Sequence, residues 1–190
     1  MAYLYMTNTS LSTGVKSLGS TTTVDWKKLQ NPSSSTYHYE GWVYIKTPAS
    51  GDKKIIERSS DVLKLNGTKL LFNSITVTED FPLQKWVYFV VNVLNGKIVE
   101  VYLNGKLVIT QQPSSLTVPT TKHDFKYGET GLDGYITQVK RDPVALNPDE
   151  VSKKYFEGNG LATFTNFLAG YNASFSLYNT EGTIKQYTAL

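Results

Sequence analysis

The sequence predicts an all-β protein, a two-sheet antiparallel jelly-roll sandwich with one short helix near residues 148–157. Three observations carry this prediction. Turn dipeptides recur at short intervals, the segments between them alternate or are rich in β-branched and aromatic residues, and one stretch alone has a good helix start. About a dozen short strands separated by such turns are typical of a sandwich.

The clearest strand pattern is the stretch WVYFVVNVLNGKIVEVYLNGKLVIT, which contains Asn95-Gly96 and Asn104-Gly105. Both residues of an Asn-Gly pair tolerate positive φ, so the pair favours the tight type I′ turn of a β-hairpin. The stretch therefore predicts three consecutive antiparallel strands, at Trp86–Leu94, Lys97–Leu103 and Lys106–Thr110.

The N-terminal part of the chain is less regular. Residues 1–23 are rich in Ser and Thr and predict an extended arm or poorly regular strands, with a short first strand at Tyr3–Met6. A further short strand is predicted at Thr23–Trp26. Tyr37–Lys46 alternates well and carries aromatic residues on both sides, so it predicts a central strand covered on both faces. One side holds Tyr37, Tyr39, Gly41, Val43 and Ile45, and the other holds His38, Glu40, Trp42, Tyr44 and Lys46.

The strands continue on both sides of the central stretch. Residues 48–52 predict a loop, and Asn66-Gly67 is a further hairpin signal. Strands are predicted at Lys54–Arg58, Asp61–Leu65, Leu70–Phe72, Ile75–Thr78, Asp124–Tyr127 and Gly134–Lys140. In residues 161–190, which we expect to close the sheets, strands are predicted at Ala162–Leu168, Ser174–Tyr178 and Thr183–Tyr187.

The helix start lies at Asn147-Pro148-Asp149-Glu150. Asn147 can cap the helix, Pro148 suits the first helical position, and Glu150 lies three residues after the cap, as in a capping box. Gly158 can end the helix. The pattern predicts a helix of about ten residues.

Composition sets broad limits. At 190 residues we expect one domain over residues 1–190. The chain has no cysteine, which excludes disulfides, thiolate zinc sites and cysteine nucleophiles. Its net charge is only +3 and its lysines are scattered, so we expect no nucleic-acid partner. The N-terminus lacks the features of a signal peptide, and no apolar run approaches the roughly 20 residues of a membrane span.

The order of these segments along the chain resembles the order of strands in a known family. It is similar to a concanavalin A-like jelly roll of the laminin-G-like class over residues 36–160, the best-matched core. The segments that carry the resemblance are Tyr39–Val43, Lys54–Arg58, Lys69–Phe72, Trp86–Leu94, Val101–Lys106, Gly131–Ile136 and Leu146–Val151 with Tyr155 and Gly158. The family includes glycan-binding modules, glucanases and structural domains, so the fold does not settle the function.

The catalytic and metal-binding patterns that this fold can carry are missing from the sequence. Retaining glucanases need two carboxyl groups about 5 Å apart. Glu57 and Asp61 have an i, i+4 spacing, but no E-x-D-x-E motif occurs. We therefore predict no enzyme activity and no cofactor. His38 and His123 are far apart in sequence and suggest no metal site, and Asp133 is read as a turn residue in preference to a calcium ligand.

Candidate ligand-binding residues are aromatics near strand ends and loops, because an aromatic face can stack on a sugar ring. They are Trp26, Tyr37, Tyr44, Tyr127 and Tyr171, whereas Trp42 and Trp86 lie within strands and are expected to pack in the core. Three N-glycosylation sequons begin at Asn8, Asn66 and Asn172.

Two functions follow as hypotheses. The first is a non-catalytic structural module of a larger assembly, with other proteins as partners. The resemblance extends this to a minor capsid or virion-surface protein, since large DNA viruses carry similar domains, and implies a virion or other particle assembled in the cytoplasm. The alternative is a carbohydrate-binding module or adhesin, which the surplus of tyrosine (13 residues) favours.

Overall fold

The computed structural model describes residues 10–12, 14–114, 116–119 and 122–159, together with the backbone of residues 174–179 and 182–188. The chain divides into two compact units, Met1–Phe156 and Glu157–Leu190. The expectation of one domain over residues 1–190 stays a prediction.

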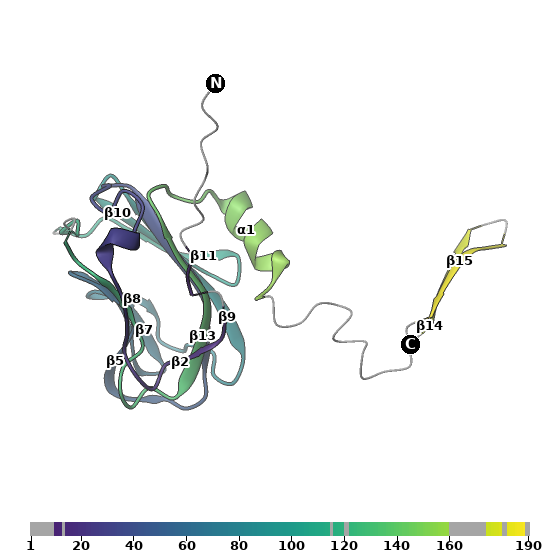
Figure 1. The fold of residues 1–190 in the computed structure, drawn as a ribbon, viewed down its shortest axis with the longest axis horizontal. Coiled ribbons are helices and arrows are strands. Elements are labelled where there is room, and N and C mark those ends of the chain that lie inside the picture. The colour runs from purple at the N-terminus through teal and green to yellow at the C-terminus, as the bar shows by residue number, and fades with distance from the viewer. Residues whose placement is uncertain are drawn as a thin grey trace, which may run out of the picture. The chain divides into compact units, whose positions relative to one another are not determined.

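The first unit contains two antiparallel sheets, which confirms the predicted two-sheet sandwich (Figure 1). The larger sheet has the order β1-β13-β4-β9-β10-β11, with β2 paired to β13. Its strands are β1 (Ser10–Ser12), β2 (Lys16–Ser17), β4 (Tyr37–Ile45), β9 (Trp86–Leu94), β10 (Ile98–Leu103), β11 (Lys106–Gln111) and β13 (Gly134–Asp142).

The smaller sheet has the order β3-β12-β5-β6-β7-β8. Its strands are β3 (Thr22–Val24), β5 (Ala49–Arg58), β6 (Asp61–Gly67), β7 (Lys69–Phe72), β8 (Ile75–Thr78) and β12 (Phe125–Tyr127). Apolar side chains from both sheets pack together in one core, which is the arrangement expected when two sheets bury their inner faces against each other.

The meander of β9, β10 and β11 confirms the two Asn-Gly hairpins. Asn95 and Gly96 have φ of 52° and 61°, and Asn104 and Gly105 have φ of 51° and 79°. Positive φ at both central residues is the signature of a type I′ turn. The second turn is also fixed by its side chain, because Asn104 Oδ1 accepts a hydrogen bond from the Tyr88 N–H at 3.0 Å.

Strand β4 is the predicted central strand, paired with β13 on one side and β9 on the other. Its side chains at Tyr37, Tyr39, Val43 and Ile45 lie in the main core. Gly41 faces the same way, where an added Cβ would come within 3.1 Å of the Phe89 ring, so the glycine leaves room for that ring. The opposite face is buried as well, because a helix covers it.

That helix is α1 (Pro148–Glu157), which lies against the outer face of the larger sheet (Figure 1). The predicted capping box is present: the Asn147 N–H donates to Glu150 Oε2 at 2.8 Å, and the Glu150 N–H donates to Asn147 Oδ1 at 2.9 Å. The Tyr155 ring stacks on Trp42 with centroids 5.7 Å apart. The helix and sheet bury a second apolar cluster that contains Trp42, Tyr88, Val90, Tyr102, Leu146 and Val151, with Trp86 packed against it.

Two local predictions need correction. Residues 48–52 were expected to be a loop, but β5 already begins at Ala49 and pairs with β6 across a register shift at Gly51, where φ is 72°. A β-bulge of this kind hides a strand from sequence patterns because it breaks the alternation. The strand expected at Thr23–Trp26 is β3, and Trp26 instead begins the 3-10 helix η1 (Trp26–Lys28), capped by Asp25.

The structure describes part of each end of the chain. Between residues 10 and 24 the chain forms the short strands β1, β2 and β3, which fits the prediction of poorly regular strands. Strands β14 (Ser174–Asn179) and β15 (Gly182–Thr188) are present, but they pair with each other in a separate two-stranded sheet. The expectation that residues 161–190 close the sheets stays a prediction. The strands expected at Tyr3–Met6 and Ala162–Leu168 lie outside the described residues.

Across the described residues, no helix combines the length and apolar character that a membrane crossing requires.

Candidate binding groove beside β12

The structure places the candidate aromatic residues in different environments. Tyr37 and Tyr127 are buried, with 0% and 3% of their surface exposed, so neither presents an open ring face on which a sugar could stack. Tyr44 is half-buried and packs against Trp86 and Tyr135. Trp26 is half-buried and packs on the core. Tyr171 lies outside the described residues.

Tyr37 is held in the core by a carboxylate. The hydroxyls of Tyr37 and Tyr39 donate to Asp61 Oδ2 at 2.6 and 2.9 Å. Burial raises the pKa of Asp61 to about 6, although these hydrogen bonds and the charges of Arg58 and Arg141 act in the opposite direction. Burial and the nearby Asp61 raise the pKa of both tyrosines. The cluster is a buried polar network inside the sandwich.

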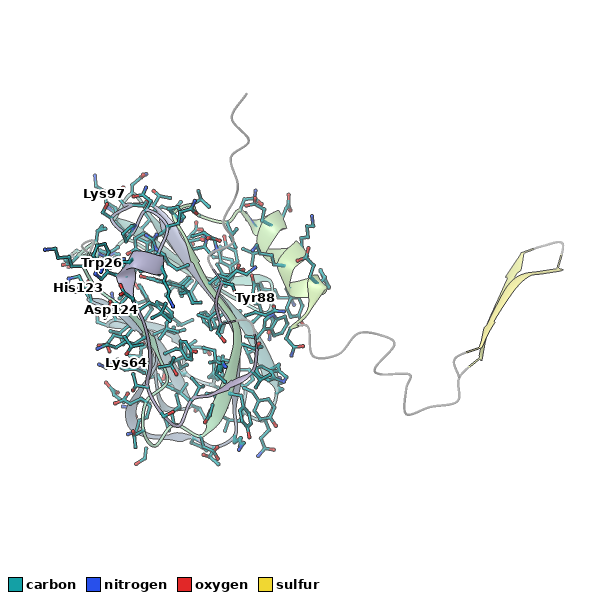
Figure 2. The ribbon with its side chains drawn as sticks, in the orientation of Figure 1. Trp26, Lys64, Tyr88, Lys97, His123 and Asp124 are labelled. Atoms are coloured by element: carbon teal, nitrogen blue, oxygen red, sulfur yellow. The ribbon has the colours of Figure 1, made fainter. Side chains whose placement is uncertain are left out.

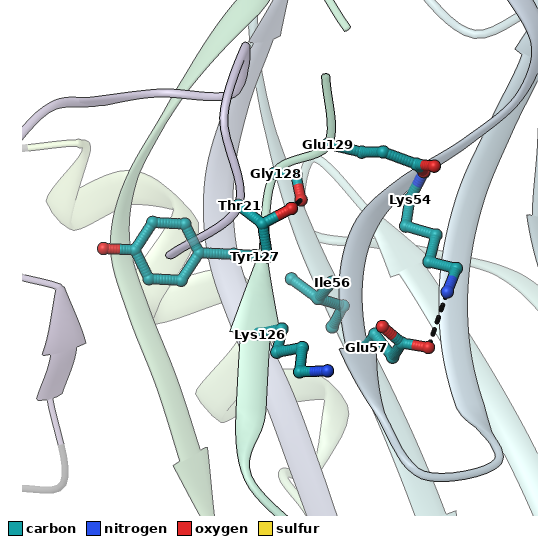
Figure 3. Close-up of a pocket in the computed structure, with 8 residues that line it drawn as sticks. All are labelled: Thr21, Lys54, Ile56, Glu57, Lys126, Tyr127, Gly128 and Glu129. Carbon is teal, nitrogen blue, oxygen red and sulfur yellow. Dashed lines mark hydrogen bonds and ion pairs between the residues drawn. The ribbon is translucent and has the colours of Figure 1, made fainter. Parts of the chain in front are cut away.

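Two adjoining pockets lie over the other side of β12. Their volumes are about 150 and 310 Å³, and both include Glu57 and Lys126 in their walls. The first pocket is lined by Thr21, Lys54, Ile56, Glu57, Lys126, Tyr127, Gly128 and Glu129 (Figure 3). The second is lined by Glu57, Ser59, Lys122, His123, Asp124 and Lys126. We call the two pockets together the β12 groove.

The pairing of β12 with β5 creates this groove. Lys126 lies opposite Glu57 in the register of these strands, so residues almost seventy positions apart share one wall. Adjacent residues of a strand point to opposite faces. Lys126 therefore faces the groove, whereas the Tyr127 ring points away from Lys54 and Glu57 (Figure 3) and joins the core. Tyr127 contributes to the groove wall without offering its ring.

In the first pocket, three of the charged side chains already have partners. Lys54 Nζ pairs with Glu57 Oε1 at 2.6 Å, and the Lys54 N–H donates to Glu129 Oε2 at 2.6 Å. The Thr21 hydroxyl donates to the Gly128 carbonyl at 3.1 Å, which ties the segment before β3 to the end of β12. These bonds give the wall a fixed shape.

The second pocket is lined by lysine side chains that can bind an anion. Asp124 Oδ1 accepts the Trp26 N–H at 2.9 Å, and the Arg58 side chain donates to the His123 carbonyl at 3.2 Å, so the segment before β12 is anchored. Trp26, His123 and Asp124 lie close together at one side of the sandwich (Figure 2). Among the described residues, the side chains of Lys122 and Lys126 have no hydrogen-bond or ion-pair partner.

Other predicted site residues have structural partners. Asp133 Oδ1 pairs with Lys46 Nζ at 3.1 Å on the surface. Glu57 lies in the groove and Asp61 in the core, so the two carboxylates do not face a common substrate position. The exposed Asn66 donates its side-chain N–H to Asp52 at 2.7 Å. Asn8 and Asn172 lie outside the described residues.

One cluster was missed by the sequence analysis. His38, Glu40 and Asp142 place one potential ligand atom each within 4.8 Å of one another. His38 and Glu40 share a face of β4, which their i, i+2 spacing already indicated, but Asp142 comes from β13 and needed the strand pairing. Burial opposes ionisation of Glu40, yet its contacts with His38, Lys154 and Tyr88 outweigh burial and lower its pKa to about 2.

Comparison with known proteins identifies the fold alone. No family model matches the sequence, and no curated protein matches it. Among solved structures, the binding domain of botulinum neurotoxin DC in complex with rat synaptotagmin II has a TM-score of 0.59 at 14% identity, over 77% of this chain and 45% of that chain. The same domain in complex with SialylT gives a TM-score of 0.58 at 14% identity, over 77% and 45%.

A third match is a structure of botulinum neurotoxin type C, a toxin whose cell entry is described as dependent on interaction with two ganglioside molecules. Its TM-score is 0.54 at 15% identity, over 65% of this chain and 36% of that chain. This chain therefore spans less than half of the solved chains it matches. The chain shares its β-sandwich fold with toxin receptor-binding domains, and its resemblance to the laminin-G-like class stays a prediction.

Proposed function

We propose that this chain is a non-catalytic binding module and that the β12 groove binds an acidic glycan. The observation that carries the proposal is the pair of cations, Lys122 and Lys126, that line an open polar pocket without a protein partner among the described residues. Cations in such a position attract a negatively charged ligand. A neighbouring fold bound to SialylT adds support for a glycan.

The rest of the groove fits a sugar ligand. The hydroxyl of Ser59 and the carboxylates of Glu57 and Asp124 offer donors and acceptors for sugar hydroxyls. A carboxylate or sulfate on the sugar would pair with Lys122 and Lys126. Both lysines are near solvent, so each contact is expected to contribute no more than about 1 kcal/mol, and the affinity is expected to fall as salt is added.

A glycan array with sialylated, sulfated and neutral oligosaccharides tests the proposal. The wild-type chain should bind acidic glycans in preference to their neutral parents, and K122A/K126A should lose that preference. The control K106A/K153A removes the same charge from exposed positions on β11 and α1. Binding only to neutral glycans, or equal loss in both double variants, would contradict the proposed site.

A second candidate function is an interaction module within a larger assembly, which includes the minor capsid or virion-surface role suggested by the resemblance. It is favoured by β11, an edge strand of the larger sheet on which Leu107 and Val108 are 51% and 42% exposed. An open edge with apolar side chains can pair with a strand of another protein. Mass spectrometry of particles purified from the native source should find the chain in fixed stoichiometry; its absence from them would remove this candidate.

A further inference from the structure

The cluster of His38, Glu40 and Asp142 lies on the outer face of the larger sheet, beside α1 and away from the β12 groove. His38 and Glu40 are two residues apart on β4, and Asp142 lies opposite His38 on β13. His38 is 1% exposed and Glu40 3%, whereas the Asp142 side chain is 27% exposed. The cluster is therefore buried on two sides and reachable from solvent at Asp142.

The His38 ring has one nitrogen whose role is fixed. Nδ1 lies 2.7 Å from the Val144 carbonyl oxygen, which can only accept, so Nδ1 carries a proton and donates it. A backbone carbonyl that holds Nδ1–H in this way presents Nε2 as the free nitrogen, which is the usual arrangement of a metal-binding histidine.

The free nitrogen faces two anions. Nε2 lies 3.9 Å from Glu40 Oε1 and 3.9 Å from Asp142 Oδ2, and it has no hydrogen-bond partner in the described structure although it is fully buried. If Nε2 carries no proton, its lone pair meets two carboxylate oxygens, which is electrostatically unfavourable. A positive centre between the three atoms would remove that conflict.

The distances favour a metal ion over a proton as that centre. A proton on Nε2 would need an N···O distance of about 2.7–3.2 Å to form a hydrogen bond, and one N–H cannot point at both carboxylates. Zinc bonds of about 2.0–2.2 Å at a tetrahedral angle place neighbouring ligand atoms about 3.4 Å apart. The two observed distances of 3.9 Å thus require a contraction of about 0.5 Å for zinc and about twice that for a hydrogen bond, and the two carboxylate oxygens lie within 4.8 Å of each other.

We infer that His38 Nε2, Glu40 Oε1 and Asp142 Oδ2 form a binding site for Zn²⁺, independent of the β12 groove. One imidazole and two carboxylates are a ligand set that zinc accepts, and three protein ligands leave a fourth position open toward solvent. Calcium is disfavoured because it takes six to eight oxygen ligands. The Tyr88 hydroxyl donates to Glu40 Oε2 and so helps to hold the carboxylate that presents Oε1 to the site.

Two lysines compete with the metal for Glu40. Lys154 Nζ lies 2.7 Å from Glu40 Oε1 and Lys140 Nζ lies 3.8 Å from it. Both side chains are more than a quarter exposed, so each can turn to solvent when a cation binds. This competition distinguishes a zinc site from an ordinary salt-bridge network. If the three residues bind zinc, removing the Lys154 charge should tighten zinc binding.

The experiment is a calorimetric titration of ZnCl₂ into chelator-treated full-length protein, with Co²⁺ absorption as a second readout of the ligand geometry. The wild type should bind one Zn²⁺ per chain. H38Q and D142N should weaken binding by about tenfold or more, as loss of a ligand does. K154M should bind several-fold more tightly, and H123Q, which changes the other histidine, should match the wild type.

No zinc binding by the wild type, or an affinity unchanged in D142N, would overturn the inference. The partly exposed Asp142 makes D142N decisive if H38Q does not fold, and thermal melting identifies that case. Weaker binding in K154M would also overturn it, because the lysine would then be supporting the site and not competing with the ion. Glycan binding by the same protein tests the groove separately.

Discussion

Asp61 should make the sandwich more stable at pH 5 than at pH 7.5. Its Oδ2 accepts hydrogen bonds from Tyr37 and Tyr39, while its buried Oδ1 has no hydrogen-bond partner among the described residues. Burial raises the pKa of Asp61 from 3.8 to about 6. The folded chain therefore takes up a proton at a pH where the unfolded chain does not, and stability is gained as the pH falls through 6.

The size of the effect follows from the shift in pKa. A shift from 3.8 to about 6 corresponds to about 3 kcal/mol between a pH below both values and a pH above both. Between pH 7.5 and pH 5 the linkage relation gives about 1.4 kcal/mol of this total. The contribution is fully present below about pH 3.8 and lost above about pH 6.

Urea denaturation of the wild type and D61N at pH 5.0, 6.0 and 7.5 measures this contribution. D61N keeps an oxygen acceptor for the tyrosine hydroxyls but cannot titrate, so the difference between the two proteins isolates Asp61 from the other ionisable groups. The difference in unfolding free energy should change by about 1.4 kcal/mol in favour of the wild type at pH 5. A difference that does not vary with pH, or one that favours the wild type more at pH 7.5, would refute the reasoning.

Three further predictions concern the stability of the fold and the packing of α1 on the sheet. N147A should lower the free energy of unfolding by about 1 kcal/mol because it removes the helix cap, whereas N66A on the surface should not; equal effects would argue against the cap. G128A should cost more than about 2 kcal/mol, since φ is +78° and the new Cβ would overlap the Ser20 carbonyl oxygen; a change within error in urea titrations would contradict this. Y155A should cost about 1 kcal/mol by removing the stack on Trp42 and should speed amide exchange in α1, while unchanged exchange would mean that the helix is held otherwise.

Local chemistry made part of this fold predictable. The two Asn-Gly turns and the capping box at Asn147 depend on residues within one turn of each other, so the sequence alone contained the information. The central strand at Tyr37–Lys46 was recognised for a similar reason, because aromatic residues on both sides indicated that both faces are covered.

Other features depended on which strands become neighbours. Alternation along β4 did not indicate that Tyr37 faces the core, since both faces of this strand carry aromatic residues. Strand β12 has only three residues, too few for alternation to show that Tyr127 shares the core face with Phe125. The β12 groove and the His38 cluster each join segments that are far apart in the chain. Lys126 meets Glu57 only through the pairing of β12 with β5, and Asp142 meets His38 only through the pairing of β13 with β4.

The most direct test of the central claim, that the β12 groove binds acidic glycans, is an NMR titration of the labelled chain with a sialylated oligosaccharide. The amide shifts that change should cluster at residues 122–129 and 54–59, and they should be smaller in K122A/K126A and at high salt. Shift changes centred on β11 or α1, or shifts unchanged in the double variant, would contradict the account.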